Sequence, residues 1–282
     1  MSILKKFLIT SRYDKPHGIL LLFFPCVWGL SLNQVNIKEK IFLYIIFFIG
    51  SCGMRSLGCI WNDFNDKALD IQVSRTKTRL IASNNVKNKE MILFALINGI
   101  IGSFPLYFLS TYSVLISLTV VPLIIVYPFM KRLTWWPQLW LGLCFNWGIL
   151  VGFSVFNNSL FNLELVLFYI GSVFFTVGYD TIYGFQDLVD DEKIGIKSTS
   201  IKFKKTPKLF LFLIYSFAFI FWILSLYQIE RSFLIIFLFL YFYFFILIKV
   251  KLLNFKNPLA CNKLFNYNSY ICLAITLVLM IK

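Results

Sequence analysis

Charged residues are scarce in this sequence of 282 residues. Asp, Glu, Lys and Arg together make up 14% of the chain, whereas they make up about 25% of an average soluble domain. Hydrophobic residues account for 59%, and a soluble fold of this composition would leave far too much apolar surface in water. The composition therefore excludes a soluble enzyme, a disordered chain and a small secreted module held together by disulfides.

The sequence also has little of what a histidine or cysteine site needs. His17 is the only histidine, which argues against a histidine-based metal site and a Ser–His triad. The six cysteines show no C-x-x-C spacing and mostly lie in apolar runs, so we expect small buried side chains that form neither disulfides nor metal ligands. Residues 1–18 lack a long apolar core and a small-residue cleavage site, so we expect no secretory signal peptide.

Long apolar runs dominate what is present, and they predict membrane-spanning helices. A spanning helix needs about 20 mostly apolar residues. The runs lie at about residues 18–34, 40–60, 91–110, 113–130, 138–156, 163–184, 208–226, 233–249 and 264–281. We therefore expect an all-α, polytopic membrane protein of about nine transmembrane helices, forming a single domain over residues 1–282.

The distribution of Lys and Arg between the loops predicts the orientation in the membrane. Of 27 cationic residues, 22 fall before the first run or in the loops after the second, fourth, sixth and eighth runs. Four fall on the other side, and Arg55 lies inside the second run. Because Lys and Arg are retained on the cytoplasmic side, we expect a cytoplasmic N-terminus. The net charge of +14 then reports orientation, and we expect no nucleic-acid partner.

The acidic residues are concentrated in two short segments that both fall on the predicted cytoplasmic side. Eight of the 13 lie there: Asp63, Asp66, Asp70, Asp180, Asp187, Asp190, Asp191 and Glu192. The segments follow the second and sixth runs, four spans apart. This arrangement indicates two related helical halves, about residues 1–137 and 138–282.

The spacing within these segments predicts a metal site. Asn62, Asp66 and Asp70 stand at i, i+4 and i+8, which places their oxygens on one face if the segment is helical. Asp187 and Asp191 repeat the i, i+4 spacing. Like charges at this spacing repel each other unless a cation lies between them. The five residues are therefore candidate ligands of Mg²⁺, which binds proteins through a few carboxylates together with substrate phosphates.

Basic residues accompany the acids. Arg75, Arg79 and Lys197 lie in the same segments, and Lys131 and Arg132 lie in the intervening loop. Carboxylates with Mg²⁺ and surrounding Arg or Lys are suited to bind a diphosphate. The alternative is that both segments are solvated loops with helix caps and topogenic cations, and the matching spacing on one side of the membrane favours the diphosphate site.

Arg55 and three residues near Asp187 are further candidates. An arginine inside a membrane span is costly, so Arg55 is a candidate functional residue by default. The alternatives for it are a structural ion pair with Asp63 or Asp180, or snorkelling to the interface. Tyr179, Asp180 and Tyr183 lie one to two turns before Asp187 and could line a pocket or simply pack.

These segments resemble the signatures of the UbiA family of intramembrane prenyltransferases. Residues 62–70 (NDFNDKALD) match the pattern NDxxDxxxD, and residues 187–191 (DLVDD) match DxxxD. RYDKPHG, MRSLGC, VSRTKTR, YPFMKR, YDTIYGFQD and KIGIKST, at Arg12, Arg55, Arg75, Tyr127, Tyr179 and Lys193, are similar to the branch that prenylates 4-hydroxybenzoate. One departure is Leu80, where that branch usually has proline.

The resemblance implies a fold, a reaction and partners. It implies nine spans around a central cavity that the two acidic loops cap. It implies Mg²⁺-dependent transfer of a polyprenyl group from polyprenyl diphosphate to the ring carbon ortho to the hydroxyl of 4-hydroxybenzoate, a step in ubiquinone biosynthesis, with Mn²⁺ as a substitute metal. The lipid bilayer would take up the tail. A bacterial plasma membrane, or alternatively a mitochondrial inner membrane, would house the enzyme.

Residue roles follow from the same resemblance. The candidate ligands Asn62, Asp66, Asp70, Asp187 and Asp191 would hold Mg²⁺ against the diphosphate. Arg79, Lys131 and Lys197 would neutralise the diphosphate first, and Arg75 and Arg132 would assist. Arg55 would bind the aromatic carboxylate, and Asp180 would orient the phenol or take the ring proton.

Two other functions remain open at this stage. A relative within the family could prenylate a naphthoate, a haem vinyl group or a chlorin. An ion-coupled transporter would use intramembrane acids as an ion pathway. It would carry those acids near the middle of its spans, whereas the acids of this sequence gather at span ends beside cations.

Overall fold

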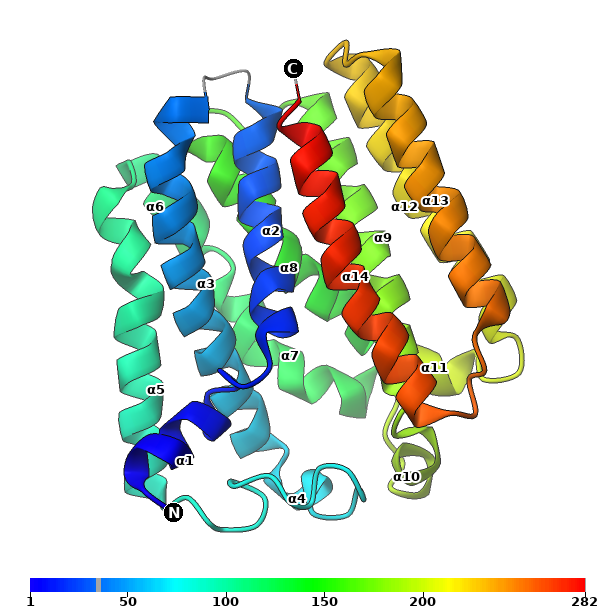
Figure 1. Cartoon of the computed structure of the whole chain (residues 1–282). Coiled ribbons are helices and arrows are strands. Elements are labelled where there is room, and N and C mark those ends of the chain that lie inside the picture. Colours follow the sequence, from blue (N-terminus) through cyan, green and yellow to red (C-terminus); the bar gives the residue numbers. More distant parts are fainter. Residues whose placement is uncertain (34–36, 282) are drawn as a thin grey trace.

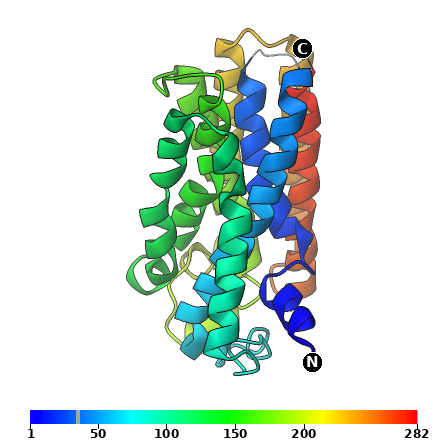
Figure 2. The same cartoon turned by 90° about the vertical axis from the view of Figure 1, so that its left-hand side faces the viewer.

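The computed structural model describes residues 1–33 and 37–281, and over these residues the chain is helical with connecting loops and no strand. Long helices run side by side along one axis and form a bundle, while short helices lie at one end (Figure 1). The N-terminus lies at that end and the C-terminus at the opposite end, as the view turned by 90° also shows (Figure 2). Because the two termini lie at opposite ends, the chain runs along the bundle an odd number of times.

The helices have the following bounds in chain order. They are α1 (Ile3–Thr10), α2 (Pro16–Leu32), α3 (Ile37–Asn65), α4 (Lys67–Asp70), α5 (Asn88–Ser103), the 3₁₀ helix η1 (Phe104–Phe108), α6 (Thr111–Leu118), α7 (Val121–Leu133), α8 (Pro137–Ser154), α9 (Leu163–Gly184), α10 (Leu188–Lys193), α11 (Thr199–Lys202), α12 (Pro207–Gln228), α13 (Phe233–Leu252) and α14 (Pro258–Leu279).

Each of the nine predicted runs lies on helix in the described part of the chain. The third run comprises α5 and η1, and the fourth comprises α6 and α7. Six segments are long and apolar enough to cross a membrane by themselves: Lys40–Asn65, Asn88–Phe108, Thr111–Leu133, Leu163–Gly184, Pro207–Gln228 and Phe233–Leu252. Helix α2 is apolar but shorter. The all-α membrane architecture is confirmed, and α2, α8 and α14 complete the bundle between the six long segments.

Proline determines where four of the long helices begin. Pro16, Pro137, Pro207 and Pro258 stand in the first turn of α2, α8, α12 and α14. Proline has no N–H to donate, and the first-turn N–H groups have no partner within a helix, so this position tolerates it. Each of these prolines therefore marks the boundary between a loop and the helix that follows it.

Glycine allows α2 and α8 to pack closely. A Cβ atom at Gly152 of α8 would overlap the carbonyl oxygen of Cys26 in α2, and one at Gly148 would lie 2.6 Å from the Cys26 Sγ. The two glycines are four residues apart and lie on one face of α8. Small residues at this spacing let two backbones approach within a membrane, where van der Waals packing drives helix association.

An aromatic cluster joins α2, α9, α12 and α14. Trp28 and Trp222 are almost fully buried, with ring centroids 5.8 Å apart. The Trp28 indole N–H donates to the Thr276 hydroxyl (2.8 Å), and that of Trp222 donates to the Ser172 hydroxyl (2.9 Å). Both polar groups are thus satisfied in an apolar interior, where an unpaired N–H would be costly.

Candidate functional site: two acidic loops over a cavity

The two acidic segments have the same local structure and lie at the same end of the bundle. Helix α3 ends at Asn65, Asp66 is the N-cap of the short helix α4, and Asp187 is the N-cap of α10 just after α9 ends at Gly184. Neither side chain accepts a capping hydrogen bond from the first turn of its own helix. A continuous helical face through Asn62, Asp66 and Asp70 was therefore wrong: the helix is interrupted at Asp66.

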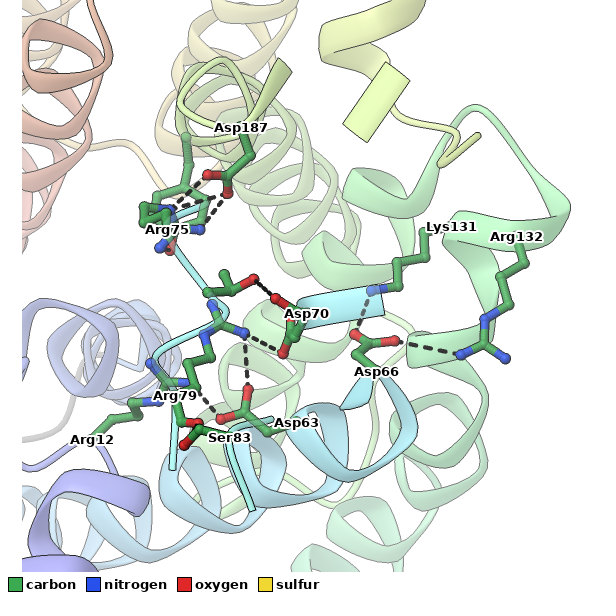
Figure 3. A network of polar contacts seen from close by, with 12 residues as sticks. Arg12, Asp63, Asp66, Asp70, Arg75, Arg79, Ser83, Lys131, Arg132 and Asp187 are labelled. Atoms are coloured by element: carbon green, nitrogen blue, oxygen red, sulfur yellow. Dashed lines mark hydrogen bonds and ion pairs between the residues drawn. The ribbon is translucent and has the colours of Figure 1, made fainter. Parts of the chain in front are cut away.

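Asp66 is held between two cations from α7. The Lys131 Nζ lies 2.5 Å from the Asp66 Oδ2, and the Arg132 Nη2 lies 3.7 Å from the Oδ1 (Figure 3). The side chain of Asp66 is 1% exposed, and burial raises the pKa of its carboxyl, an effect that Lys131 partly offsets. Its Oδ1 accepts no hydrogen bond from the described residues.

Asp63 and Asp70 share Arg79. The Arg79 Nη1 lies 3.0 Å from the Asp63 Oδ1 and 2.9 Å from the Asp70 Oδ2. The Arg12 Nη2 contacts the other oxygen of Asp63 at 2.5 Å. Both carboxylates are buried, so each is paired as a buried charge requires.

Arg75 joins the two acidic segments. Its guanidinium donates to both carboxylate oxygens of Asp187, with the Nε 2.8 Å from the Oδ1, and its Nη1 donates to the Tyr183 hydroxyl (2.8 Å). The backbone N–H of the preceding residue, Ser74, donates to the Asp190 carboxylate (2.8 Å). The two loops are thus latched to each other across the end of the bundle (Figure 3).

Asp191 differs from Asp63, Asp66, Asp70 and Asp187 because no Lys or Arg of the described residues forms an ion pair with it. Burial, and then the nearby negative charge of Asp187, raise the pKa of Asp191 to about 7. A carboxylate with a raised pKa beside a second carboxylate is a place where an added cation would be favourable.

A cavity of about 1000 Å³ lies beneath the latched loops. Seven of the predicted site residues line it: Arg55, Asn62, Arg75, Arg79, Tyr179, Asp180 and Tyr183. Its walls are polar near the loops. Towards the opposite end of the bundle they are apolar and include Phe47, Leu109 and Val151.

The other seven predicted residues surround this cavity without lining it. They are Asp66, Asp70, Lys131, Arg132, Asp187, Asp191 and Lys197. Six of them belong to the two acidic segments or the end of α7 that pairs with them. Lys197 lies apart from the ion pairs: its backbone N–H donates to the Lys131 carbonyl (2.8 Å) and its Nζ donates to the Leu133 carbonyl (3.3 Å).

Arg55 lies inside the bundle and points along the cavity wall. Its guanidinium lies over the Phe145 ring, 5.6 Å from the centroid, and its Nη1 donates to the Cys59 Sγ. Its Nε has no hydrogen-bond partner among the described residues. The sequence left open an ion pair between Arg55 and Asp63. Arg55 forms no such pair in the described part of the chain, because the Asp63 carboxylate is paired with Arg12 and Arg79. Asp180 lies near enough for electrostatic interaction with Arg55.

Two cavity residues were missed as site residues. Arg12 has a φ of 60°, a left-handed conformation that costs a residue other than glycine about 1–2 kcal/mol; such strain often marks a functional position. The Gln186 Nε2 is buried without a partner and its residue lines the cavity. Both residues lie in motifs that the sequence analysis quoted, Arg12 in RYDKPHG and Gln186 in YDTIYGFQD, but neither was selected as a site residue.

The residues fit a divalent cation by chemistry, although those that the structure describes form no preformed cage. Among the described residues, no group of three or more His, Cys, Asp or Glu side chains converges as a metal site does. The donors near the loops are nevertheless carboxylate and amide oxygens, which Mg²⁺ prefers. The Oδ1 of Asp66 is buried and accepts no hydrogen bond from the described residues, and Asp191 has no ion-pair partner among them, so a divalent cation would find an available carboxylate oxygen at both.

Comparison with known proteins agrees with this geometry. A profile of the UbiA prenyltransferase family matches residues 22–271. The chain is 40% identical over 209 residues to a mitochondrial 4-hydroxybenzoate polyprenyltransferase of Dictyostelium discoideum, covering 73% of this chain and 45% of that protein. It is 38% identical over 203 residues to a 4-hydroxybenzoate octaprenyltransferase of Marinomonas sp. (strain MWYL1), covering 72% of this chain and 71% of that protein.

Solved structures share the fold. A UbiA homologue from Aeropyrum pernix K1 matches with a TM-score of 0.70 and 21% identity, covering 93% of this chain and 95% of that one. A UbiA homologue from Archaeoglobus fulgidus, solved with GPP and Mg²⁺, matches with a TM-score of 0.70 and 15% identity, covering 98% and 99% of the two chains.

The bundle and its loop-capped cavity define a polytopic, all-helical membrane protein with a polar site at one end. The chain belongs to the UbiA prenyltransferase family. It spans about half the length of the mitochondrial relatives it matches.

Proposed function

We propose that this protein is a Mg²⁺-dependent 4-hydroxybenzoate polyprenyltransferase of ubiquinone biosynthesis, with Mn²⁺ as a substitute metal. The observation that carries the proposal is the cavity, which is polar beneath the paired Arg and Asp residues and apolar towards the other end of the bundle. A polyprenyl diphosphate has the same division into a charged head and an apolar chain. Two relatives at 38–40% identity are named for this activity.

The diphosphate would bind beneath the two latched loops. Asn62, Asp66, Asp70, Asp187 and Asp191 would hold Mg²⁺ there, and Mg²⁺ would supply charge neutralisation of the leaving diphosphate. The guanidinium groups of Arg75 and Arg79 already lie on the cavity wall, where Arg forms bidentate contacts with phosphate.

The remaining predicted cations, Lys131, Arg132 and Lys197, do not line the cavity and would act from outside its wall. Lys131 and Arg132 flank Asp66 and would contribute positive charge beside it. Lys197 would add positive charge to the same region, although its Nζ donates a hydrogen bond to the Leu133 carbonyl at the end of α7. Stabilising the charge that develops on the departing diphosphate lowers the barrier to breaking the C–O bond.

The allylic cation left by that cleavage would meet the aromatic ring within the cavity. Arg55 would bind the carboxylate of 4-hydroxybenzoate, and Asp180 would orient the phenol or take the proton released from the ring carbon. Tyr179 and Tyr183 line the same wall and present aromatic faces, which attract cations. The apolar walls of the membrane-embedded cavity would limit the access of water, which would otherwise trap the cation.

The enzyme would lie in a bacterial plasma membrane or a mitochondrial inner membrane, with the site facing the cytoplasm or the matrix. The excess of Lys and Arg in the loops at the site's end supports this orientation. The bilayer would accommodate the distal part of a long prenyl chain.

The direct test is a transfer assay with purified protein in lipid or detergent. The expected product of 4-hydroxybenzoate and a polyprenyl diphosphate is the 3-prenylated acid, identified by mass, formed with Mg²⁺ or Mn²⁺ and lost in EDTA. Asp66→Ala or Asp191→Ala should lower turnover by about 100-fold or more, with membrane insertion intact. Activity that persists in EDTA would rule out the proposed metal-assisted reaction.

An acceptor panel tests the substrate separately. With one prenyl diphosphate, 4-hydroxybenzoate should react, whereas a naphthoate, a haem and a chlorin should not. Preferential prenylation of any of the other three would replace 4-hydroxybenzoate as the acceptor and leave the family chemistry intact.

A further inference from the structure

Four acidic side chains of the two segments are paired with the protein's own cations. These ion pairs join Asp63, Asp66, Asp70 and Asp187 to five cations, Arg12, Arg75, Arg79, Lys131 and Arg132. Several of these acids are the candidate metal ligands, and several of these cations are the candidate diphosphate ligands. The same groups therefore cannot serve both partners at once.

We propose that Mg²⁺ and the diphosphate bind as a coupled pair by exchanging partners within this network. When both are present, the carboxylates turn from Arg and Lys to the metal, and the freed cations turn to the phosphate oxygens. The inference rests on the proposed function for its ligand class, a diphosphate with a divalent cation.

Either ligand alone meets an opposing cost. Mg²⁺ at Asp187 must displace Arg75, and the guanidinium, whose side chain is 35% exposed, then loses its carboxylate partner. Diphosphate alone must draw Arg75 away and leave the Asp187 carboxylate, whose side chain is 11% exposed, without its partner. Leaving a charge uncompensated is unfavourable, and the cost is greater for the less exposed Asp187 than for Arg75.

The two ligands together remove both costs. Each carboxylate that loses a guanidinium gains the metal, and each guanidinium that loses a carboxylate gains a phosphate. The affinity for each ligand must then rise in the presence of the other by the same factor. The lack of a converging group of acids among the described residues agrees with a metal site that is completed only when the cations leave.

Arg75 is placed for this exchange. It comes from the loop after α4, reaches Asp187 and Tyr183 at the end of α9, and lines the cavity. Arg75 thus both holds the Asp187 carboxylate, as Figure 3 shows, and belongs to the wall of the cavity in which a diphosphate would bind. In the proposed exchange its side chain would rotate from the carboxylate to the phosphate.

Opposite single substitutions test the exchange by binding. Purified full-length protein is titrated by calorimetry with Mg²⁺ alone, and separately with sodium diphosphate in EDTA. We expect Arg75→Gln to bind Mg²⁺ alone about 5- to 10-fold more tightly than wild type, because Asp187 is freed. We expect Asp187→Asn to bind diphosphate alone more tightly by a similar factor, because Arg75 is freed; both sizes lie within the usual range of coupling between sites.

Both variants should bind geranyl diphosphate with Mg²⁺ at least about tenfold more weakly than wild type. A residue that only supports the fold would give weaker binding in all three titrations, and that result would overturn the inference. Lys131→Gln and Asp66→Asn provide a second pair with the same expected opposite gains, and they decide the matter if the first pair does not fold.

Lys204→Gln is the matched control. It removes the ion pair between Lys204 and Glu192, which lies on α10 outside the network, and it should leave all three titrations unchanged. Transfer to 4-hydroxybenzoate by wild type is measured separately. If Mg²⁺ and diphosphate bind in a coupled way but no prenyl group is transferred, the exchange is supported and the proposed function is rejected. If transfer occurs but the two ligands bind independently, the proposed function is supported and the exchange is rejected.

Discussion

Asp191 shows how position alone can change the chemistry of one residue. Its neighbour Asp187 has Arg75 as a partner, whereas Asp191 pairs with no cation of the described chain, and its pKa rises to about 7. At pH 5–7 the folded protein then holds a proton that the unfolded chain, with an ordinary carboxyl pKa of 3.8, has already released.

The sign of the resulting pH dependence follows from proton linkage. Where the folded state binds more protons, the free energy of unfolding falls as pH rises. In EDTA, wild type should therefore lose stability between about pH 4 and pH 7 relative to Asp191→Asn, which cannot ionise. Thermal unfolding of both proteins across this range measures the difference, and a constant gap in Tm would contradict the raised pKa.

Arg55 and Gly18 form a second residue-scale test. A Cβ atom at Gly18 would lie 2.7 Å from the Arg55 Nε, so Gly18→Ala should push the guanidinium aside. Because a flexible side chain can yield, we expect a stability change within about 0.5 kcal/mol. The apparent KM for the aromatic acid should rise several-fold, as for Arg55→Ala, with little change for the diphosphate. The reverse pattern of KM values would remove the role assigned to Arg55.

At the scale of helices, the contact between α2 and α8 decides the shape of the cavity. Gly148 and Val151 of α8 and Cys26 of α2 line the cavity, so the distance between these helices sets its width. That distance depends on glycine, because Gly29 and Gly152 each face backbone atoms of the other helix too closely for a Cβ atom.

Gly152→Ala should separate the two helices. The overlap is with backbone, which cannot swing away as a side chain can, so we expect a loss of about 1–3 kcal/mol of stability, as for overpacked cores. Gly99→Ala in α5 is the matched control, because its Cβ atom would meet only the Leu57 side chain at 3.9 Å. It should be neutral or stabilise by up to about 1 kcal/mol. Equal Tm values for both variants would show that the contact is not tight.

The element boundaries also show what a local pattern can predict. Apolar runs predicted the ends of the long helical segments to within six residues, the largest difference being at the start of α14, since the length and hydropathy of a span are properties of a contiguous segment. The interruption at Asp66 was not predicted. The spacing of Asn62, Asp66 and Asp70 is the same whether the helix continues or restarts there, and the capping tendency of aspartate is only a local preference.

At the scale of the whole molecule, orientation is the property still to be tested. Lys205 lies in the loop between α11 and α12 at the site's end, and Asn158 lies in the loop between α8 and α9 at the other end. In a background without the native cysteines, a membrane-impermeant maleimide added to intact cells should label Asn158→Cys and spare Lys205→Cys. Lysis should expose both, and the opposite labelling pattern would place the site on the outer side.

The amino-acid sequence alone was enough to predict the class of structure and the end of the bundle at which the acids and cations gather. Hydropathy, loop charge and the two acidic motifs are properties of contiguous segments of the sequence. A membrane-spanning helix needs about 20 apolar residues, and this requirement does not depend on which helices it packs against. Those constraints were sufficient to predict an all-α membrane protein with its acids and cations at one end.

Which acid pairs with which cation depends on the tertiary fold. Arg12 and Asp63 are 51 residues apart, and Arg75 and Asp187 are 112 residues apart, so their pairing depends on how α1, α3 and α9 pack. The apolar faces of these helices can pack in many registers, and side-chain volume and close glycine contacts select one. That selection pairs the candidate metal ligands with the candidate diphosphate ligands and encloses the cavity beneath them.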